Sequence, residues 1–183
     1  MPLAYIALGA NLPSPVGPPD ATFAAALEHI RSLGRIAAHS SLYSTAPVGV
    51  ADQPRFLNAV VALETVLAPR PLLDALLTIE RFFARDRSAS VPNGPRTLDL
   101  DLLLYGDLVL AEPGLEIPHP RLAQRAFVLV PLAEIAPNLR IRPSGLTAAQ
   151  LLANLQPHAD PAAAVRFASP HWSIESGSTA KES

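Results

Sequence analysis

The sequence contains no cysteine, and only 5% of its 183 residues are aromatic. The absence of cysteine excludes disulfide bonds and metal sites built from thiolates. The sequence also has no long apolar run and no basic leader followed by an apolar segment, so nothing in it indicates membrane insertion or export. We therefore expect a cytoplasmic protein that does not associate with membranes.

Charge is sparse as well, because charged residues make up 16% of the chain and the formal net charge is −2. Such a balance provides no broad basic field for nucleic acid, so an anionic ligand would need locally placed arginines. Hydrophobic residues account for 49% of the chain, which is typical of a globular domain of this length. We expect a monomer with a single domain over residues 1–156. The Pro, Ala and Ser content of residues 157–183 predicts a partly disordered extension.

The apolar pattern predicts alternating strands and helices bounded by Gly, Pro and Asp. Their order, β-α-β-β-α-β, is the split βαβ or ferredoxin-like arrangement of an α+β fold. Beyond Gly106 we expect a short hairpin and two additional helices in the same domain, at residues 127–135 and 147–155. The core elements expected are a strand at 4–8, a helix capped by Asp20, strands at 36–43 and 56–65, a helix beginning at Pro69 and a strand at 98–105.

The last of these strands contains two acidic residues separated by one position. Side chains alternate along a strand, so the leucines at every second position from Leu98 to Leu104 share the core face, and Asp99 and Asp101 share the other. Two such carboxylates lie roughly 7 Å apart, in a residue type that is depleted from strands. A magnesium ion would relieve their repulsion, and the pair could bridge two ions. The alternative is an amphipathic strand with a solvated outer face.

The strand order brings further polar residues to the same region. In the ferredoxin-like order the first strand lies between the third and fourth and is antiparallel to both, so Gly9, Phe56 and Asn58 approach the two aspartates. An aromatic ring and an amide can stack on and hydrogen-bond to a flat heterocycle. Burial under a loop is an equally good interpretation of Phe56.

Four arginines flank this face of the predicted sheet. Arginine suits phosphate because its planar donors bind in a bidentate way and its charge persists, although each arginine alone would also suit a solvated surface. Together with two metal-binding aspartates they predict phosphoryl transfer, in which positioning and charge neutralisation provide most of the catalysis. The small polar residues between 84 and 95 predict a mobile lid. The four arginines are Arg85, Arg87, Arg96 and Arg125.

Several motifs follow one another in a fixed order over about residues 3–140. They are Ala-Tyr-Ile-Ala-Leu-Gly-Ala-Asn-Leu at 4–12, Asp-Gln-Pro at 52–54 leading to Phe-Leu-Asn-Ala at 56–59, Gly-Pro-Arg-Thr-Leu-Asp-Leu-Asp at 94–101, and Pro-His-Pro-Arg at 118–121 with Arg125 and Phe127. Together these motifs resemble those of the 6-hydroxymethyl-7,8-dihydropterin pyrophosphokinases of folate synthesis. The resemblance implies a magnesium- and ATP-dependent enzyme.

The family resemblance implies transfer of the β,γ-pyrophosphoryl group of ATP to the pterin hydroxymethyl group, with release of AMP. Two magnesium ions would be held by Asp99 and Asp101, and the pterin would lie between Phe56 and Phe127. The resemblance further implies pterin contacts by Gly9, Thr45, Pro47, Val48 and Asn58, nucleotide contacts by Glu80, Arg87, His119 and Arg125, and contacts to the moving phosphates by Arg85 and Arg96.

Three other functions use some of the same residues. Nucleotidyltransferases bind two metals with an Asp-x-Asp strand, but the Gly-Ser helix start that usually precedes it is missing upstream of Asp99. An RNA-binding or ligand-sensing module can have the ferredoxin-like fold, yet an RNA-binding sheet needs paired aromatics and basic surroundings. An ordinary kinase, which transfers only the γ-phosphate and leaves ADP, would suit the same metal and arginines.

Overall fold

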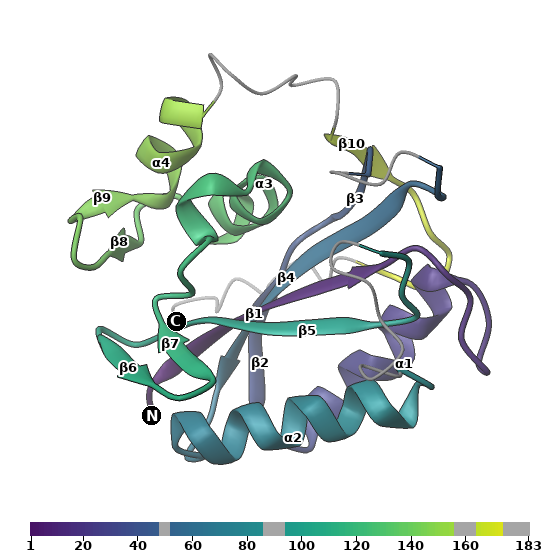
Figure 1. The fold of residues 1–183 in the computed structure, drawn as a ribbon, viewed down its shortest axis with the longest axis horizontal. Coiled ribbons are helices and arrows are strands. Elements are labelled where there is room, and N and C mark those ends of the chain that lie inside the picture. The colour runs from purple at the N-terminus through teal and green to yellow at the C-terminus, as the bar shows by residue number, and fades with distance from the viewer. Residues whose placement is uncertain (48–51, 86–93, 156–163, 174–183) are drawn as a thin grey trace, which may run out of the picture.

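The structure is a mixed fold of strands and helices in a single domain, as the sequence predicts. A six-stranded antiparallel sheet lies between two helical layers (Figure 1). At its centre β1 (Leu3–Ala10) pairs with β4 (Phe56–Glu64) on one side and with β5 (Asp99–Tyr105) on the other. These are the neighbours expected for the first of the predicted strands. The computed structural model describes residues 1–47, 52–85, 94–155 and 164–173.

The strand predicted at residues 36–43 is two strands. β2 (Arg35–His39) and β3 (Leu42–Thr45) both pair with β4, and Ser40 and Ser41 separate them. The Ser40 hydroxyl accepts a hydrogen bond from the backbone N–H of Val60 at 3.0 Å, in place of a regular ladder contact. Serine favours such an interruption because its side chain competes with the backbone for hydrogen bonds.

Helices α1 (Pro19–Arg31) and α2 (Pro69–Phe82) cover one face of the sheet (Figure 1). Both begin with proline, whose fixed φ suits the first helical position. The prediction that Asp20 caps the first helix is wrong, because the residue before the helix is Pro18 and no side chain caps it. The Asp20 carboxylate instead accepts a hydrogen bond from the Ser169 hydroxyl at 2.7 Å.

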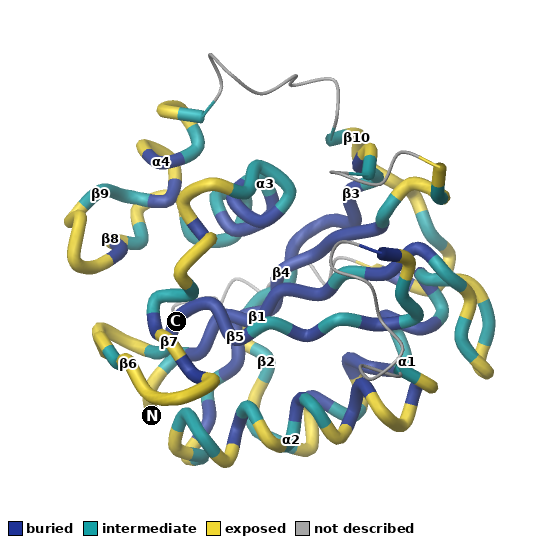
Figure 2. Tube along the Cα trace, in the orientation of Figure 1, coloured by how far each residue is buried: buried dark blue, intermediate teal, exposed yellow. Residues whose placement is uncertain are grey.

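Helices α3 (Ala126–Ile135) and α4 (Ala148–Leu155) pack on the opposite face, with a second cluster of buried residues beneath them. The sequence predicts both helices within one residue of their observed starts. It does not predict that they bury part of this face. Figure 2 shows the central strands as buried and the outer turns of the helices as exposed.

The alternation expected along the fourth predicted strand fails at its end. The pairing of β1 with β5 shifts register between Tyr5 and Ile6, as in a β-bulge. A bulge adds one residue to one strand, so the residues beyond it change face. Leu98, Leu100 and Leu102 therefore face α1 and α2, whereas Leu104 lies in the second cluster.

Short elements complete the domain. The predicted hairpin beyond Gly106 consists of β6 (Leu110–Glu112) and β7 (Leu115–Ile117), and a 3-10 turn, η1 (Leu122–Gln124), precedes α3. Between α3 and α4, β8 (Arg140–Ile141) pairs with β9 (Leu146–Thr147). Among the described helices, none has the length and apolar character needed to cross a membrane.

The described part of the C-terminal extension joins the sheet. β10 (Ala164–Phe167) pairs antiparallel with β3 at the edge of the sheet. Beyond it Trp172 is buried in the first core cluster, where its indole N–H donates to the Ser40 carbonyl at 2.8 Å and its ring meets Phe23 edge-on. The sequence pattern does not predict either contact.

Candidate active site

Four side-chain positions form a row across the sheet, on the face opposite α1 and α2. Gly9 on the central strand pairs with Asn58 on β4 and with Asp99 on β5, and Asn58 pairs with Tyr43 on β3. A methyl group built on Gly9 would lie 3.6 Å from Asn58 Oδ1 and 3.9 Å from Asp99 Cβ. The missing side chain of Gly9 therefore leaves room for a methyl-sized group between an amide and a carboxylate.

Three arginines converge on the two aspartates from different elements. Arg96, in the loop before β5, places Nη1 2.6 Å from Asp99 Oδ2, and Arg85, after α2, places Nη2 3.7 Å from Asp99 Oδ1. Arg125, at the start of α3, places Nη1 3.3 Å from Asp101 Oδ2. The three guanidinium groups exceed the two carboxylates by one positive charge, so the group favours an anionic ligand.

The end of α2 explains the position of Arg85. The Arg85 N–H bonds to the Glu80 carbonyl and the Ala84 N–H to the Arg81 carbonyl, which together make a Schellman motif. Ala84 has φ of 61°, the left-handed conformation that this motif requires. The helix end therefore turns the chain so that Arg85 projects toward Asp99.

Asn11 holds the loop that carries Arg96, a role the sequence analysis missed. Its side-chain oxygen accepts from the Arg96 N–H at 2.8 Å, and its Nδ2 donates to Gln53 Oε1 and to the Pro54 carbonyl, each at 3.0 Å. Asn11 is buried, so these bonds are shielded from water. The only local signal is the position of Asn11 in a turn directly after a buried strand.

His119 approaches Asp101 from the segment after β7. Its Nε2 lies 4.0 Å from Asp101 Oδ2, and its Nδ1 accepts from the backbone N–H of Arg121 at 3.2 Å. Burial lowers the pKa of His119, and the nearby Asp101 opposes this shift without reversing it. The neutral ring therefore carries its proton on Nε2, which faces the carboxylate group.

Two aromatic rings border the arginines. The Arg96 guanidinium carbon lies 5.2 Å from the centre of the Phe56 ring, and that of Arg125 lies 5.5 Å from the centre of the Phe127 ring. These are cation–π distances. Phe56 and Phe127 are both half-buried.

The predicted pterin-edge residues divide into a described and an undescribed set. Asn58 Nδ2 donates to Thr45 Oγ1 at 2.7 Å, and both side chains are buried. Pro47 is half-buried beyond the end of β3. Val48 lies outside the described residues, as do Arg87, which is predicted to contact the nucleotide, and most of the loop predicted to be a lid.

A model of the 7,8-dihydro-6-hydroxymethylpterin-pyrophosphokinase (HPPK) family matches residues 5–137. The chain belongs to this family. The prediction that it is an enzyme of the pyrophosphokinase class is thereby confirmed. Asp99 and Asp101, the three arginines and both aromatic rings all lie within the matched residues.

Curated relatives of this HPPK chain cover most of its length. A 2-amino-4-hydroxy-6-hydroxymethyldihydropteridine pyrophosphokinase from Pseudomonas aeruginosa is 48% identical over 151 residues, which is 81% of this chain and 89% of the relative. A protein of the same name from Methylorubrum extorquens is 43% identical, over 86% of this chain and 96% of its own.

A solved structure shows the same fold in a longer protein. A triple mutant of Plasmodium falciparum HPPK-DHPS aligns with a TM-score of 0.70 at 15% sequence identity. The alignment covers 90% of this chain but 46% of the Plasmodium chain. The likeness therefore extends to less than half of that larger protein.

In this HPPK chain, Glu80 is not brought to the open face where the sequence predicts a nucleotide contact. Its side chain is 1% exposed, and Oε1 accepts a hydrogen bond from the Leu100 N–H at 2.8 Å. β5 is the edge strand of the sheet, so its outward N–H groups need a partner other than a strand. The geometry thus gives Glu80 a supporting position beneath the two aspartates.

The donor set of this HPPK chain fits a magnesium site that substrate completes. Among the described residues, no group of three or more His, Cys, Asp or Glu side chains could hold a metal ion. Magnesium, however, commonly binds one or two carboxylates, several waters and substrate phosphates. Asp99 and Asp101 supply hard oxygens on one face, and the arginines beside them suit the phosphates.

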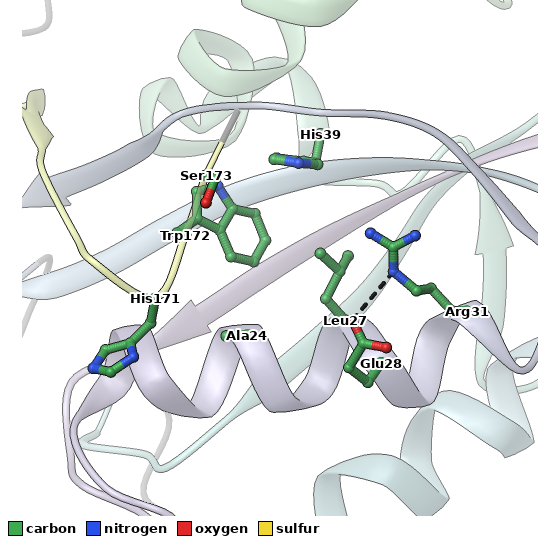
Figure 3. Close-up of a pocket in the computed structure, with 8 residues that line it drawn as sticks. All are labelled: Ala24, Leu27, Glu28, Arg31, His39, His171, Trp172 and Ser173. Carbon is green, nitrogen blue, oxygen red and sulfur yellow. Dashed lines mark ion pairs between the residues drawn. The ribbon is translucent and has the colours of Figure 1, made fainter. Parts of the chain in front are cut away.

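A pocket on the other side of the sheet contains none of the predicted site residues. It lies between α1 and the segment after β10 (Figure 3), and its volume is about 180 Å³. Arg31 within it pairs with Glu28 on the same helix, at 3.2 Å. The remaining residues that line it are Ala24, Leu27, His39, His171, Trp172 and Ser173.

Proposed function

We propose that this chain transfers the β,γ-pyrophosphoryl group of ATP to the hydroxymethyl group of 6-hydroxymethyl-7,8-dihydropterin, with magnesium, and releases AMP. The convergence of Arg85, Arg96 and Arg125 on Asp99 and Asp101 carries phosphoryl transfer, and the choice of two phosphoryl units over one rests on the family match. The family match supports it, because curated members are named as pyrophosphokinases of this hydroxymethyl pteridine.

The charged cluster supports a triphosphate substrate. Asp99 and Asp101 would hold magnesium, which when bound would neutralise phosphate charge and orient the triphosphate. Arginine guanidinium groups bind phosphate oxygens in a bidentate way, and Arg85 and Arg96 already lie at one carboxylate. His119, with its proton on Nε2, can donate to a phosphate oxygen on the side of Asp101.

The neighbouring rings and amide support a flat heterocyclic acceptor. Phe56 and Phe127 each offer an apolar surface beside a guanidinium group, and a pterin is a planar ring of suitable kind. Asn58 and Thr45 form a buried polar pair that can hydrogen-bond to a ring edge. The space above Gly9 lies between this pair and the aspartates, where a hydroxymethyl group would meet a phosphate.

The proposed step forms one bond at the β-phosphorus and breaks another, and it releases one proton. The hydroxymethyl oxygen attacks the β-phosphorus of ATP, and the bond from that phosphorus to the oxygen bridging it to the α-phosphorus breaks. The bridging oxygen leaves with AMP, and the hydroxyl proton passes to water. Arginines placed around the phosphates stabilise the charge that develops, which is the main contribution a protein makes to phosphoryl transfer.

Product analysis tests this proposal. The protein is incubated with magnesium, ATP and reduced hydroxymethylpterin, and the products are identified by mass spectrometry. We expect AMP and a pterin diphosphate ester, with neither formed when the pterin is omitted. Formation of ADP and a pterin monophosphate would favour the ordinary kinase and overturn the pyrophosphoryl step.

We also infer that β1, α1, the β2–β3 pair, β4, α2 and β5 constitute a ferredoxin-like core. The order of these elements along the chain and the central position of β1 support this assignment. The cytoplasmic location and the monomeric state stay predictions.

A further inference from the structure

One carboxylate outside the proposed site links α3 to β3 and β10. Glu134, near the end of α3, accepts hydrogen bonds from the Ser41 N–H at 2.8 Å and the Ser41 hydroxyl at 2.7 Å. The Tyr43 hydroxyl donates to the same carboxylate at 3.1 Å, and Arg166 on β10 does so at 3.0 Å. Two oxygen atoms therefore serve four donors.

The charged partner contributes least to this network. The Arg166 side chain is 67% exposed, whereas that of Glu134 is 20% exposed. Exposed ion pairs stabilise weakly, but hydrogen bonds to a shielded carboxylate are among the stronger ones. Burial raises the pKa of Tyr43, so its hydroxyl keeps its proton and remains a donor. The hydrogen bonds from Ser41 and Tyr43 to Glu134 are therefore the main link between α3 and β3.

On the helix side, Glu134 shares a face of α3 with Phe127, whose ring is proposed to contact the pterin. Phe127 lies seven residues earlier in α3, which is two helical turns, so both side chains project to the same side. Anchoring Glu134 therefore fixes the rotation of α3 about its axis and its distance from β3. The position of the Phe127 ring depends on both.

On the strand side, the residues bonded to Glu134 lie next to the other residues proposed to contact the pterin. Ser41 immediately precedes β3, and Tyr43 within it pairs with Asn58 of β4. Thr45, at the end of β3, accepts the hydrogen bond from Asn58. Glu134 thus ties the strand that carries Thr45 to the helix that carries Phe127.

We propose that Glu134 is a positioning residue that sets the separation of the two sides of the pterin pocket. The inference rests on the proposed function, because it assumes that pterin lies between Phe127 and the Asn58–Thr45 pair. Glu134 itself does not touch the substrate in this account. It acts through Ser41 and Tyr43 on one side and through α3 on the other.

The test is binding of each substrate to Glu134→Gln, which keeps the shape of the side chain but loses its charge and one acceptor. Calorimetric titrations use a non-hydrolysable ATP analogue with magnesium and, with that analogue already bound, 6-hydroxymethyl-7,8-dihydropterin. We expect pterin affinity to fall roughly tenfold, the effect of losing a charged hydrogen bond, with nucleotide affinity within about twofold of wild type. A merely structural role would reduce the folded fraction and leave the affinity of the folded protein unchanged.

Glu64→Gln is the matched control, because Glu64 also pairs with an arginine, Arg35, but at the opposite end of β4. We expect wild-type affinities for both ligands in this variant. Should Glu134→Gln fail to fold by circular dichroism, Tyr43→Phe removes a single donor and should weaken pterin binding in the same direction.

The outcomes separate this inference from the function on which it rests. If the wild type binds pterin and folded Glu134→Gln binds it equally well, the positioning role is overturned and the proposed function stands. An equal loss of affinity for pterin and for nucleotide in this variant also overturns the positioning role. If the wild type binds no pterin, the proposed function fails and the inference fails with it.

Discussion

Glu80, a fully buried carboxylate on α2, accepts a hydrogen bond from the backbone N–H of Leu100, the residue that separates Asp99 from Asp101. The bond is 2.8 Å long and joins a helix to the outer edge of the sheet. It fixes the strand at the point where both acidic side chains leave it. The spacing of the proposed metal ligands therefore depends on a residue below the sheet surface.

Replacement of Glu80 by alanine should damage stability and activity together. The Leu100 N–H would be left unsatisfied in a buried position, which costs about 1–3 kcal/mol. Urea unfolding measures the stability loss, and steady-state turnover at saturating magnesium measures the activity. Glu80→Gln keeps an acceptor and should lose less of both. Wild-type stability in Glu80→Ala would contradict the supporting role.

Replacement of Ala84 by glycine, in the Schellman motif that ends α2, should stabilise the protein. Ala84 has φ of 61°, a conformation that glycine adopts without steric cost. Ala84→Gly should raise the free energy of unfolding by about 0.5–1 kcal/mol. The matched control is Ala75→Gly, within the same helix, which should lower it by about 1 kcal/mol. Denaturant unfolding of both variants decides the sign, and destabilisation by both would refute the helix-end account.

Replacement by alanine should have different effects at two glycines: it should reduce stability at Gly34 and substrate affinity at Gly9. A methyl group on Gly34 would lie too close to the Glu64 carbonyl, whereas one on Gly9 makes ordinary contacts with Asn58 and Asp99. Gly34→Ala should therefore cost about 1–3 kcal/mol of stability with little change in substrate affinity. Gly9→Ala should fold normally and bind substrate more weakly, because it fills the proposed site. Thermal unfolding and calorimetry together check the contrast, which fails if Gly9→Ala leaves both affinities intact.

The two aspartates should be needed for turnover rather than for folding. Asp99→Ala and Asp101→Ala should each slow magnesium-dependent turnover by on the order of 10²–10³. Removal of magnesium with a chelator should abolish wild-type activity. Asp107→Ala, an exposed aspartate just beyond the same strand, is the control and should behave like the wild type. Near-normal rates in both site variants would remove the metal assignment.

Sequence patterns predict the parts of this molecule that depend on local periodicity. The alternation of Leu98 to Leu102 with Asp99 and Asp101 places both acids on one face, and the strand order brings Gly9 and Asn58 beside them. The alternation ceases to apply at the register shift opposite Tyr5. A bulge depends on how two strands pair, which one strand's sequence does not specify.

The contacts that sequence analysis missed are tertiary hydrogen bonds. Glu80 to Leu100, Asn11 to Arg96 and Glu134 to Ser41 join residues 20, 85 and 93 positions apart. No short motif encodes such a pair, because each partner has an ordinary local role in a helix or a turn. Trp172 escapes prediction for the same reason, since its core contacts come from the distant α1 and β2–β3 segments.

The central claim is that the β-phosphorus, and not the γ-phosphorus, is attacked. Phosphorus NMR of a single turnover with magnesium, ATP and reduced hydroxymethylpterin reports this directly. The account predicts resonances of AMP and of a diphosphate attached to the pterin. Resonances of ADP and a singly phosphorylated pterin would contradict it.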